Sequence, residues 1–256
     1  MQATASPQTF RRGSPPTQRR DVWWLEPLIT AVVLGGFVIY ATWAVLTGQN
    51  YWADPYLSPF FSPLLAGGKG EPLVNFSWWQ ISPAILIMWA PLGFRLTCYY
   101  YRKAYYRAFF WDPPACAVGE LHAGYIGERK FPFILQNLHR YFLYLAIIVW
   151  GFLTYDAIRA FFFPGGFGMG VGTLVLVVNS ALLGLYTFSC HSLRHRVGGC
   201  MDCPSNSKPR LKLWQIVSRL NSRHPTFAWC SLVWVAFSDM YIRLVATGAI
   251  TDLRIF

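Results

Sequence analysis

Five long apolar stretches constrain this 256-residue chain more than any other feature of its sequence. Each is about as long as the ~20 residues that an α-helix needs to cross the hydrocarbon core of a membrane. Charged residues make up only 13% of the chain, whereas soluble domains carry about 25%, so the chain lacks the polar surface of a soluble enzyme. The sequence therefore predicts an all-α integral membrane bundle of five transmembrane helices. The stretches are residues 27–46, 78–97, 131–152, 171–192 and 226–245.

The basic residues predict the orientation of this bundle. The chain has 22 Lys and Arg against 11 Asp and Glu, a net charge of +11. The basic residues concentrate before the first stretch and in the second and fourth connecting segments, whereas the first and third contain only Lys69 and Arg159. Because cytoplasmic segments carry the excess of Lys and Arg, the N-terminus is expected in the cytoplasm and the C-terminus outside. The predicted location is the cell inner (plasma) membrane.

Two domains are predicted. Residues 1–22 are rich in Pro, Ser, Thr, Gln and Arg, a composition typical of a disordered basic cytoplasmic tail. Residues 23–256 form the five-helix transmembrane domain. The charges of the tail favour anionic membrane lipid or a protein as its partner, and no nucleic-acid partner is expected.

The histidines and cysteines follow the same asymmetry as the charges. All five His and all six Cys lie in inner connecting segments or in the inner halves of the predicted helices. Ionisable groups inside a membrane are costly and mark functional sites. The thiols face a reducing compartment, so disulfides are not expected. The eleven residues are His122, His139, His191, His195, His224, Cys98, Cys116, Cys190, Cys200, Cys203 and Cys230.

Three of these residues also have a simpler interpretation. Cys230 suits a small buried hydrophobic position, because free Cys is among the most buried residue types. His122 lies in a connecting segment, where a surface histidine is more common than a ligand. His224 precedes Pro225 and suits the start of the last helix.

Two candidate ligand sets for a metal centre remain. His191 and His195 share one helix face, and with Cys200 and Cys203 they give H-x3-H-x4-C-x2-C, a spacing that suits zinc or an iron–sulfur cluster. Two His and two Cys are also the ligands of a Rieske [2Fe–2S] cluster. The sequence does not choose between this set and a second one, which combines the same two histidines with residues from other helices. Those residues are Cys98, Cys116, His139 and Cys190.

Haem b is an alternative occupant. It needs two histidines on different helices at similar depth, and His139 with His191 or His195 would supply them. No histidine lies near the outer face, so a second haem is not expected there.

Three motifs point to a known family. Arg95-Leu-Thr-Cys-Tyr-Tyr-Tyr-Arg-Lys-Ala-Tyr-Tyr-Arg107 leads to Pro113-Pro-Ala-Cys116, Gln136-Asn-Leu-His-Arg-Tyr141 opens the third stretch, and Ser189-Cys-His-Ser-Leu-Arg-His195 closes the fourth. With five predicted helices, the chain after its basic tail resembles the membrane-anchor subunit of an actinobacterial succinate dehydrogenase (respiratory complex II). The resemblance covers nearly all of that length.

The resemblance implies an anchor that is not catalytic alone. It would dock a flavoprotein and an iron–sulfur subunit on the cytoplasmic face and pass electrons from succinate to quinone. It also implies a membrane-embedded Rieske-type [2Fe–2S] cluster in place of haem, on the cytoplasmic side. The alternatives are a haem b-type quinone-reducing anchor and a membrane thiol or zinc-binding protein. The positions that match the family motifs, and are the candidate ligands, are Cys98, Cys116, His139, Cys190, His191 and His195, with the Cys200–Cys203 pair ranked second.

Further polar residues are candidates for other roles. Arg95 and Arg140 either contact quinone or extend to lipid headgroups. Asp239 and Arg243 are four apart near the outer side, which predicts an ion pair within one helix, with a proton path as the alternative. The candidate quinone-binding residues are Arg95, Gln136, Arg140, Tyr141 and Ser192.

Overall fold

The structure, a computed structural model, describes residues 19–65, 74–75, 78, 80–111, 115–119, 133–199 and 206–256. The predicted disordered tail lies almost entirely outside the described residues. His122, Cys200 and Cys203 also lie outside them, so the interpretations of these residues stay predictions.

Helices dominate the described residues, which confirms the predicted all-α class. The α-helices there are α1 (Leu25–Thr47), α2 (Ala84–Thr97), α3 (Tyr99–Tyr105), α4 (His139–Arg159), α5 (Val171–Phe188), α6 (His191–Gly198), α7 (Lys208–Asn221) and α8 (His224–Ala246). Antiparallel hairpins pair β1 (Trp52–Ala53) with β2 (Tyr56–Leu57), β3 (Val74–Asn75) with β4 (Gln80–Ile81), and β5 (Phe162–Phe163) with β6 (Gly166–Phe167). Short helical turns are η1 (Pro59–Phe61), η2 (Tyr106–Phe110) and η4 (Phe133–Leu138).

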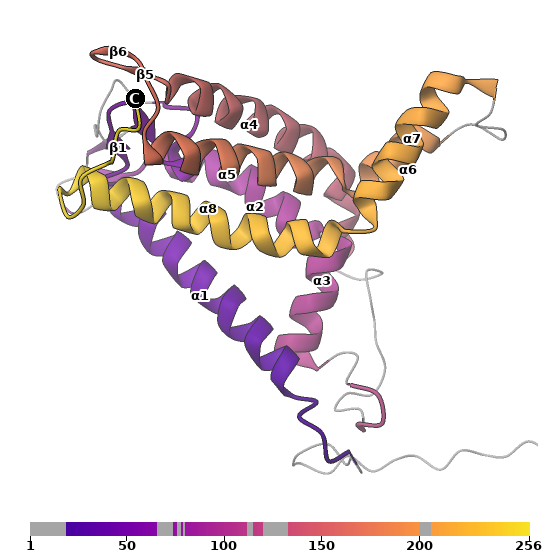
Figure 1. The fold of residues 1–256 in the computed structure, drawn as a ribbon. Coiled ribbons are helices and arrows are strands. Elements are labelled where there is room, and N and C mark those ends of the chain that lie inside the picture. The colour runs from indigo at the N-terminus through magenta and orange to yellow at the C-terminus, as the bar shows by residue number, and fades with distance from the viewer. Residues whose placement is uncertain are drawn as a thin grey trace, which may run out of the picture.

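Helices α2, α4, α5 and α8 run between the same two ends of a bundle. Helix α5 packs against α4 and α8, and α2 packs against α4, while α1 meets the bundle at one end and diverges from it toward its N-terminus (Figure 1). We call the end where α2 and α5 finish and α4 and α8 begin the cysteine end, because Cys98 and Cys190 lie there. We call the other end, where α1 and α8 finish, the ion-pair end, after Asp239 and Arg243.

Within the described residues, four helical segments are long and apolar enough to cross a membrane: α1, α4 with its preceding turn, α5 and α8. The second apolar stretch was expected to be helical from residue 78, but β4 occupies Gln80–Ile81 and α2 begins only after Pro83. Proline has a fixed φ and no N–H, so it favours the start of a helix. Helix α2 therefore has 14 residues, and a fifth crossing stays a prediction.

Two other boundaries differ from the expected ones. The third stretch was expected to be helical from residue 131, but α4 begins at His139 and continues to Arg159. The fourth was expected to continue to residue 192, but α5 ends at Phe188 and α6 begins at His191. Both changes bring a histidine to the first position of a helix at the cysteine end.

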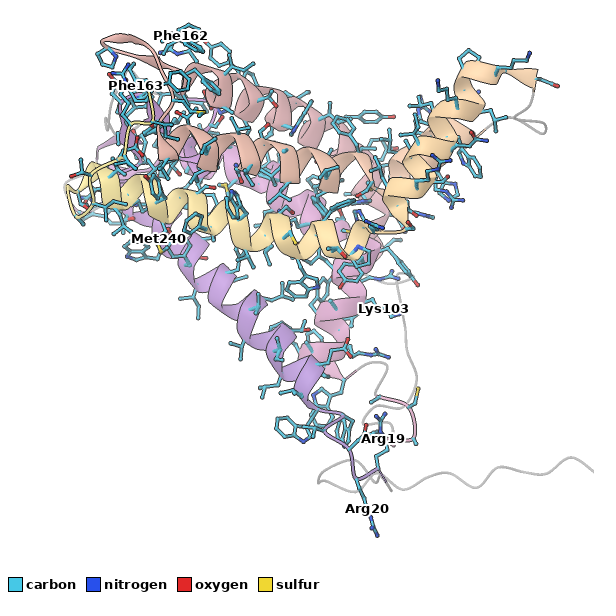
Figure 2. All side chains as sticks on the ribbon, in the orientation of Figure 1. Arg19, Arg20, Lys103, Phe162, Phe163 and Met240 are labelled. Atoms are coloured by element: carbon cyan, nitrogen blue, oxygen red, sulfur yellow. The ribbon has the colours of Figure 1, made fainter. Side chains whose placement is uncertain are left out.

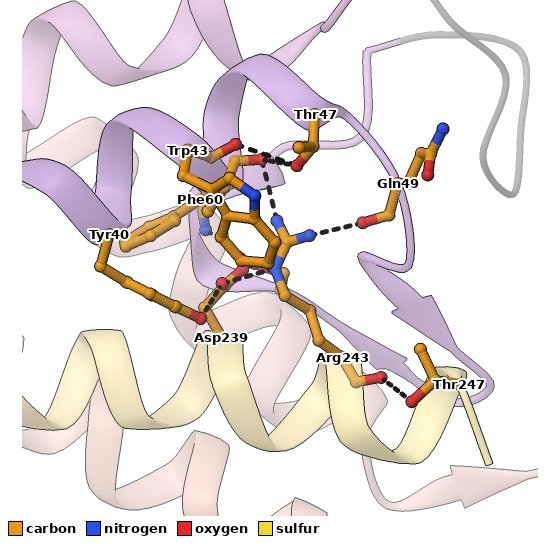
Figure 3. A network of polar contacts seen from close by, with 10 residues as sticks. Tyr40, Trp43, Thr47, Gln49, Phe60, Asp239, Arg243 and Thr247 are labelled. Carbon is orange, nitrogen blue, oxygen red and sulfur yellow. Dashed lines mark hydrogen bonds and ion pairs between the residues drawn. The ribbon is translucent and has the colours of Figure 1, made fainter. Parts of the chain in front are cut away.

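The structure confirms the predicted ion pair between Asp239 and Arg243, which lies at the ion-pair end. Arg243 Nε lies 2.7 Å from Asp239 Oδ2, and the Asp239 side chain is fully buried. The hydroxyl groups of Tyr40 and Ser58 also donate to this carboxylate. Arg243 donates to the carbonyls of Ala44 (2.9 Å) and Gln49 (2.6 Å), where α1 leaves carbonyls without helical partners (Figure 3). The pair therefore fastens α8 to the end of α1.

The cysteine end carries the projecting elements. The hairpin of α6 and α7 extends outward from the bundle, and α3 runs from the end of α2 toward the start of α1 (Figure 1). Lys103 lies on α3, and Arg19 lies beyond the start of α1, whereas Phe162 and Phe163 lie at the opposite end (Figure 2). Most of the described basic residues lie outside the ion-pair end, whose basic residues are Arg159, Arg243 and Arg254.

Candidate functional site

Cys98 and Cys190 occupy equivalent places in the chain. Each has an extended backbone conformation, with φ −64° and ψ 128° at Cys98 and φ −64° and ψ 140° at Cys190. Cys98 separates α2 from α3, and Cys190 is the residue before α6. An extended residue cannot continue an α-helix, so each cysteine marks a bend where a bundle helix gives way to a projecting one.

Both thiols are buried at the start of the following helix. Cys98 is 2% exposed and Cys190 is 1% exposed. The backbone N–H of Ser192 points at Cys190 Sγ from 3.4 Å. Helix N-termini favour negative charge, so these positions suit thiolates that bind a metal.

Each thiol faces an imidazole from another helix. His139 Nε2, at the start of α4, lies 3.0 Å from Cys190 Sγ. His224 Nε2, at the start of α8, lies 3.4 Å from Cys98 Sγ. Cys98 and Cys190 belong to one cluster of buried residues, and all four side chains line one pocket. We call these four residues the crossed cluster.

Hydroxyl groups beside the cysteines fix the tautomer of both histidines. Thr97 Oγ1 lies 2.9 Å from His139 Nδ1 and donates its proton to the Gly93 carbonyl. A hydroxyl has a single proton, so Thr97 must accept from an Nδ1–H group. The lone pair of His139 is then on Nε2, the nitrogen that faces a thiol.

The same arrangement recurs at the other histidine. Ser189 Oγ lies 2.7 Å from His224 Nδ1 and donates its proton to the Tyr186 carbonyl. The lone pair of His224 is therefore also on Nε2. Thr97 precedes Cys98 but orients the histidine that faces Cys190, and Ser189 precedes Cys190 but orients the one that faces Cys98. Two hydroxyl–imidazole pairs and two thiol–imidazole pairs therefore link the ends of α2, α4, α5 and α8.

The donor set fits a metal group. Two thiols and two imidazoles with free Nε2 lone pairs are the donors of a Rieske-type cluster or a structural zinc site. The hydroxyl of Tyr186 is buried beside the Cys98 thiol, and its ring stacks 5.1 Å from that of His224.

The remaining predicted histidines lie at the rim of the same site. His191 and His195 share a face of α6, with ring centroids 4.3 Å apart. Burial, followed by the neighbouring charges of His195 and Arg194, lowers the pKa of His191. Both histidines line a pocket of about 830 Å³ that the crossed cluster also lines.

Three of the predicted quinone-binding residues line this pocket too. They are Gln136, Arg140 and Ser192. The Gln136 amide donates to the Tyr105 hydroxyl at 2.6 Å and accepts from Arg102 at 3.2 Å, so its orientation is fixed. Arg140 is exposed at the pocket's edge.

Two predicted quinone-binding residues lie elsewhere. Arg95 turns into the bundle, where it donates to Tyr101 (2.5 Å) and Ser231 (3.0 Å) and lies over the Tyr186 ring. It borders an apolar cavity of about 260 Å³ and is held inside the bundle by these contacts. Tyr141 is 59% exposed and is not part of the lining of the pocket that the crossed cluster lines.

Two cysteines are also apart from the crossed cluster. Cys116 is exposed, and its carbonyl accepts a hydrogen bond from Arg19 at 3.0 Å. Cys230 is exposed on α8, so its interpretation as a buried hydrophobic residue is wrong.

His224 is the member of the site that the sequence analysis did not select. It does begin α8, as expected, but it is also 6% exposed and bonded through both nitrogens. The repeated hydroxyl–cysteine pairs Thr97-Cys98 and Ser189-Cys190 were the available signal. Each of the two buried cysteines faces one histidine, and His139 faces only Cys190, so Cys98 needs a second histidine.

Comparisons with known proteins identify the family. A family model described as the actinobacterial succinate dehydrogenase subunit SdhC matches residues 25–248. The chain is 46% identical to a chain in the solved structure of the Mycobacterium smegmatis Sdh1 complex in the apo form, with a TM-score of 0.87 over 98% of each chain. No curated protein matches the chain. This chain therefore belongs to the family of actinobacterial succinate dehydrogenase SdhC subunits, multi-pass membrane subunits of an oxidoreductase complex.

Proposed function

We propose that this chain connects succinate oxidation to quinone reduction and binds a Rieske-type [2Fe–2S] cluster through Cys98, Cys190, His139 and His224. The observation that carries the proposal is the crossed cluster, in which each buried thiol faces an imidazole Nε2 at 3.0 or 3.4 Å. Such a cluster supplies one-electron redox chemistry at a potential that imidazole ligands raise above that of an all-thiolate cluster.

The chain's own residues prepare these ligands. Thr97 and Ser189 hold the two imidazoles in the tautomer that leaves Nε2 free, so no proton has to leave the ring when a metal binds. Burial of Cys98 and Cys190 at 2% and 1% exposure excludes bulk water from the thiols. The Ser192 N–H stabilises negative charge on Cys190.

The composition of the donor set favours a two-iron cluster over the alternatives. A Rieske-type [2Fe–2S] cluster takes two imidazoles on one iron and two thiolates on the other, so it would use all four residues of the crossed cluster. Haem b would use the two imidazoles but leave the buried thiols of Cys98 and Cys190 without a role. Zinc takes the same donor types but has no redox chemistry, so it would not carry electrons in an oxidoreductase complex.

Quinone is proposed to bind in the pocket of about 830 Å³ beside the crossed cluster. Arg140 and Ser192 line it and supply hydrogen-bond donors for a quinone carbonyl. Gln136 lies at the same wall, with its amide held by Tyr105.

The cysteine end is proposed to face the cytoplasm and to dock the flavoprotein and iron–sulfur subunits. It carries the projecting helices α6 and α7, and short basic segments lie on the cytoplasmic side of membranes (Figure 1). This orientation places the N-terminus inside and brings the crossed cluster within reach of a soluble electron donor. The exposed basic residues of the hairpin are Arg196, Lys208, Lys212 and Arg219.

The test compares two histidines in the purified complex. We expect His224→Ala to lose succinate-dependent quinone reduction while retaining the soluble subunits and their oxidation of succinate with an artificial electron acceptor. His195→Ala is the control for the cluster, because His195 faces no thiol and this variant should keep the spectroscopic signal of the cluster even where its place in the quinone pocket lowers activity. The reverse pattern would assign the ligands to α6, and full activity in both variants would contradict the proposal.

A further inference from the structure

A second cavity, of about 670 Å³, lies between the first half of α1, α3 and the start of α8. Helix α1 diverges from α8 toward its N-terminus, and α3 crosses between them (Figure 1). The cavity shares only the wall formed by Tyr100 and Pro225 with the pocket of the crossed cluster. The two cavities can therefore hold different ligands.

Apolar side chains of α1 and α8 form much of the lining of this cavity. Ile29 and Val33 contribute from α1, and Trp229 from α8. Trp229 Nε1 donates to the Tyr100 hydroxyl at 2.7 Å, so the polar atom of this aromatic wall already has a partner. A hydrocarbon chain is the kind of group that these walls accommodate without leaving a polar atom unpaired.

Two cations lie at one edge of the cavity, on α3 and the turn that follows it. Arg107 Nε is buried without a hydrogen-bond partner in the described part of the chain. Lys103 is exposed and forms no ion pair with a described residue. Glu26 is the one carboxylate in the lining, and it lies in the first turn of α1, where the helix dipole stabilises it. The lining thus has a net positive charge and an unsatisfied guanidinium.

We propose that this cavity binds a phospholipid, with its phosphate on Lys103 and Arg107 and an acyl chain along Ile29, Val33 and Trp229. A phosphate supplies the anionic acceptor that the buried Arg107 Nε lacks, and guanidinium groups bind phosphate oxygens through paired hydrogen bonds. A quinone has a similar apolar tail but no anionic group, so it leaves the cations unpaired. The membrane that the chain spans is the source of the lipid.

The lipid also accounts for the packing of α1. Only 6% of the most apolar window of α1 is buried, compared with 50% in α5 and 44% in α8. Helix α1 contacts η2 more than it contacts any single helix of the bundle. A lipid in the cavity fills the space between the first half of α1 and α8 and joins them.

The experiment measures lipid retained by the intact, detergent-purified complex, by native mass spectrometry. The wild-type complex is expected to keep one phospholipid per chain after washing, and the double variant Lys103→Gln/Arg107→Gln to lose it at least tenfold. Arg159→Gln/Arg254→Gln removes the same charge from exposed positions outside this cavity, at the ion-pair end, and should retain the lipid. So should Glu26→Gln, which alters the same lining without removing a cation. Retention in the first variant, or equal loss in all three, would overturn the proposal.

A second measurement needs no variant and so is independent of folding defects. A photoactivatable phospholipid with a reactive group in its acyl chain is added to wild-type complex, and cross-linked peptides are mapped. We expect labelling of the α1 segment around Ile29 and Val33 and of Trp229. Labelling confined to other surfaces, or competition by quinone but not by phosphatidylglycerol, would assign the cavity to another ligand.

Discussion

At the ion-pair end of the bundle, Asp239 and Arg243 are surrounded by partners that use their hydrogen-bonding capacity: two hydroxyl groups on the carboxylate and two carbonyls on the guanidinium. At the cysteine end, a hydroxyl group pairs with Nδ1 of each histidine, whereas Nε2 of each histidine faces a thiol. Both ends bury polar groups at a cost. The buried charges at the ion-pair end hold the helices together. The buried thiols and imidazole Nε2 atoms at the cysteine end can still serve as ligands of a bound group.

The largest effect is expected from breaking the ion-pair end. Arg243→Met leaves the Asp239 carboxylate buried without its charge partner and frees the carbonyls at the end of α1. Breaking a buried pair costs about 3–5 kcal/mol, so the free energy of unfolding should fall by about that amount in denaturant titrations of the solubilised complex. Arg159→Met, at an exposed position near the same end, is the control. Equal stability of the two variants would contradict a structural role for this end.

The next effect is expected at the cysteine end, on chemistry rather than on stability. Cys98→Ala removes a proposed ligand, so the Rieske-type EPR signal should be lost and the quinone-reductase activity should fall by more than about 100-fold, beyond the usual effect of a residue that only supports a ligand. Cys116→Ala is the matched control, because Cys116 is exposed and apart from the crossed cluster. A similar loss in the control would return Cys116 to the ligand set.

A smaller effect is expected from the hydroxyl groups that orient the histidines. Thr97→Val keeps the shape of the side chain but removes the hydrogen bond to His139 Nδ1, and supporting residues of this kind contribute about 10–100-fold in metal affinity or activity. Thr97→Ser should restore the bond and the activity. Retention of the soluble subunits, measured beside the Rieske-type EPR signal, distinguishes lost ligand orientation from a folding defect. An unchanged EPR signal and activity in Thr97→Val would show that the hydroxyl does not position the imidazole.

The elements that the sequence predicted well are those set by local composition. Helices α1 and α8 begin and end within a few residues of the expected bounds, because their apolar runs are long and flanked by polar or glycine residues. The Asp239–Arg243 pair followed from helical spacing alone. The family, too, followed from motifs within single segments.

The parts that could not be predicted depend on contacts between distant segments. The sequence selected Cys98, Cys190 and His139, but it ranked them equally with Cys116. Which thiol faces which imidazole is decided by how α2, α4, α5 and α8 pack, over separations of 51 residues for His139 and Cys190 and 126 for Cys98 and His224. His224 looked like a helix start because Pro225 explains its position without a ligand role.

The central claim is that Nε2 of His139 and of His224 are ligands of a [2Fe–2S] cluster in this chain. Pulsed EPR of the dithionite-reduced complex, with histidine labelled by nitrogen-15 at Nε2 only, tests it most directly. The account predicts a Rieske-type signal coupled to two labelled nitrogens, one of which disappears in His224→Ala while both persist in His195→Ala. A signal without histidine coupling, or one whose coupling is lost in His195→Ala and kept in His224→Ala, would contradict it.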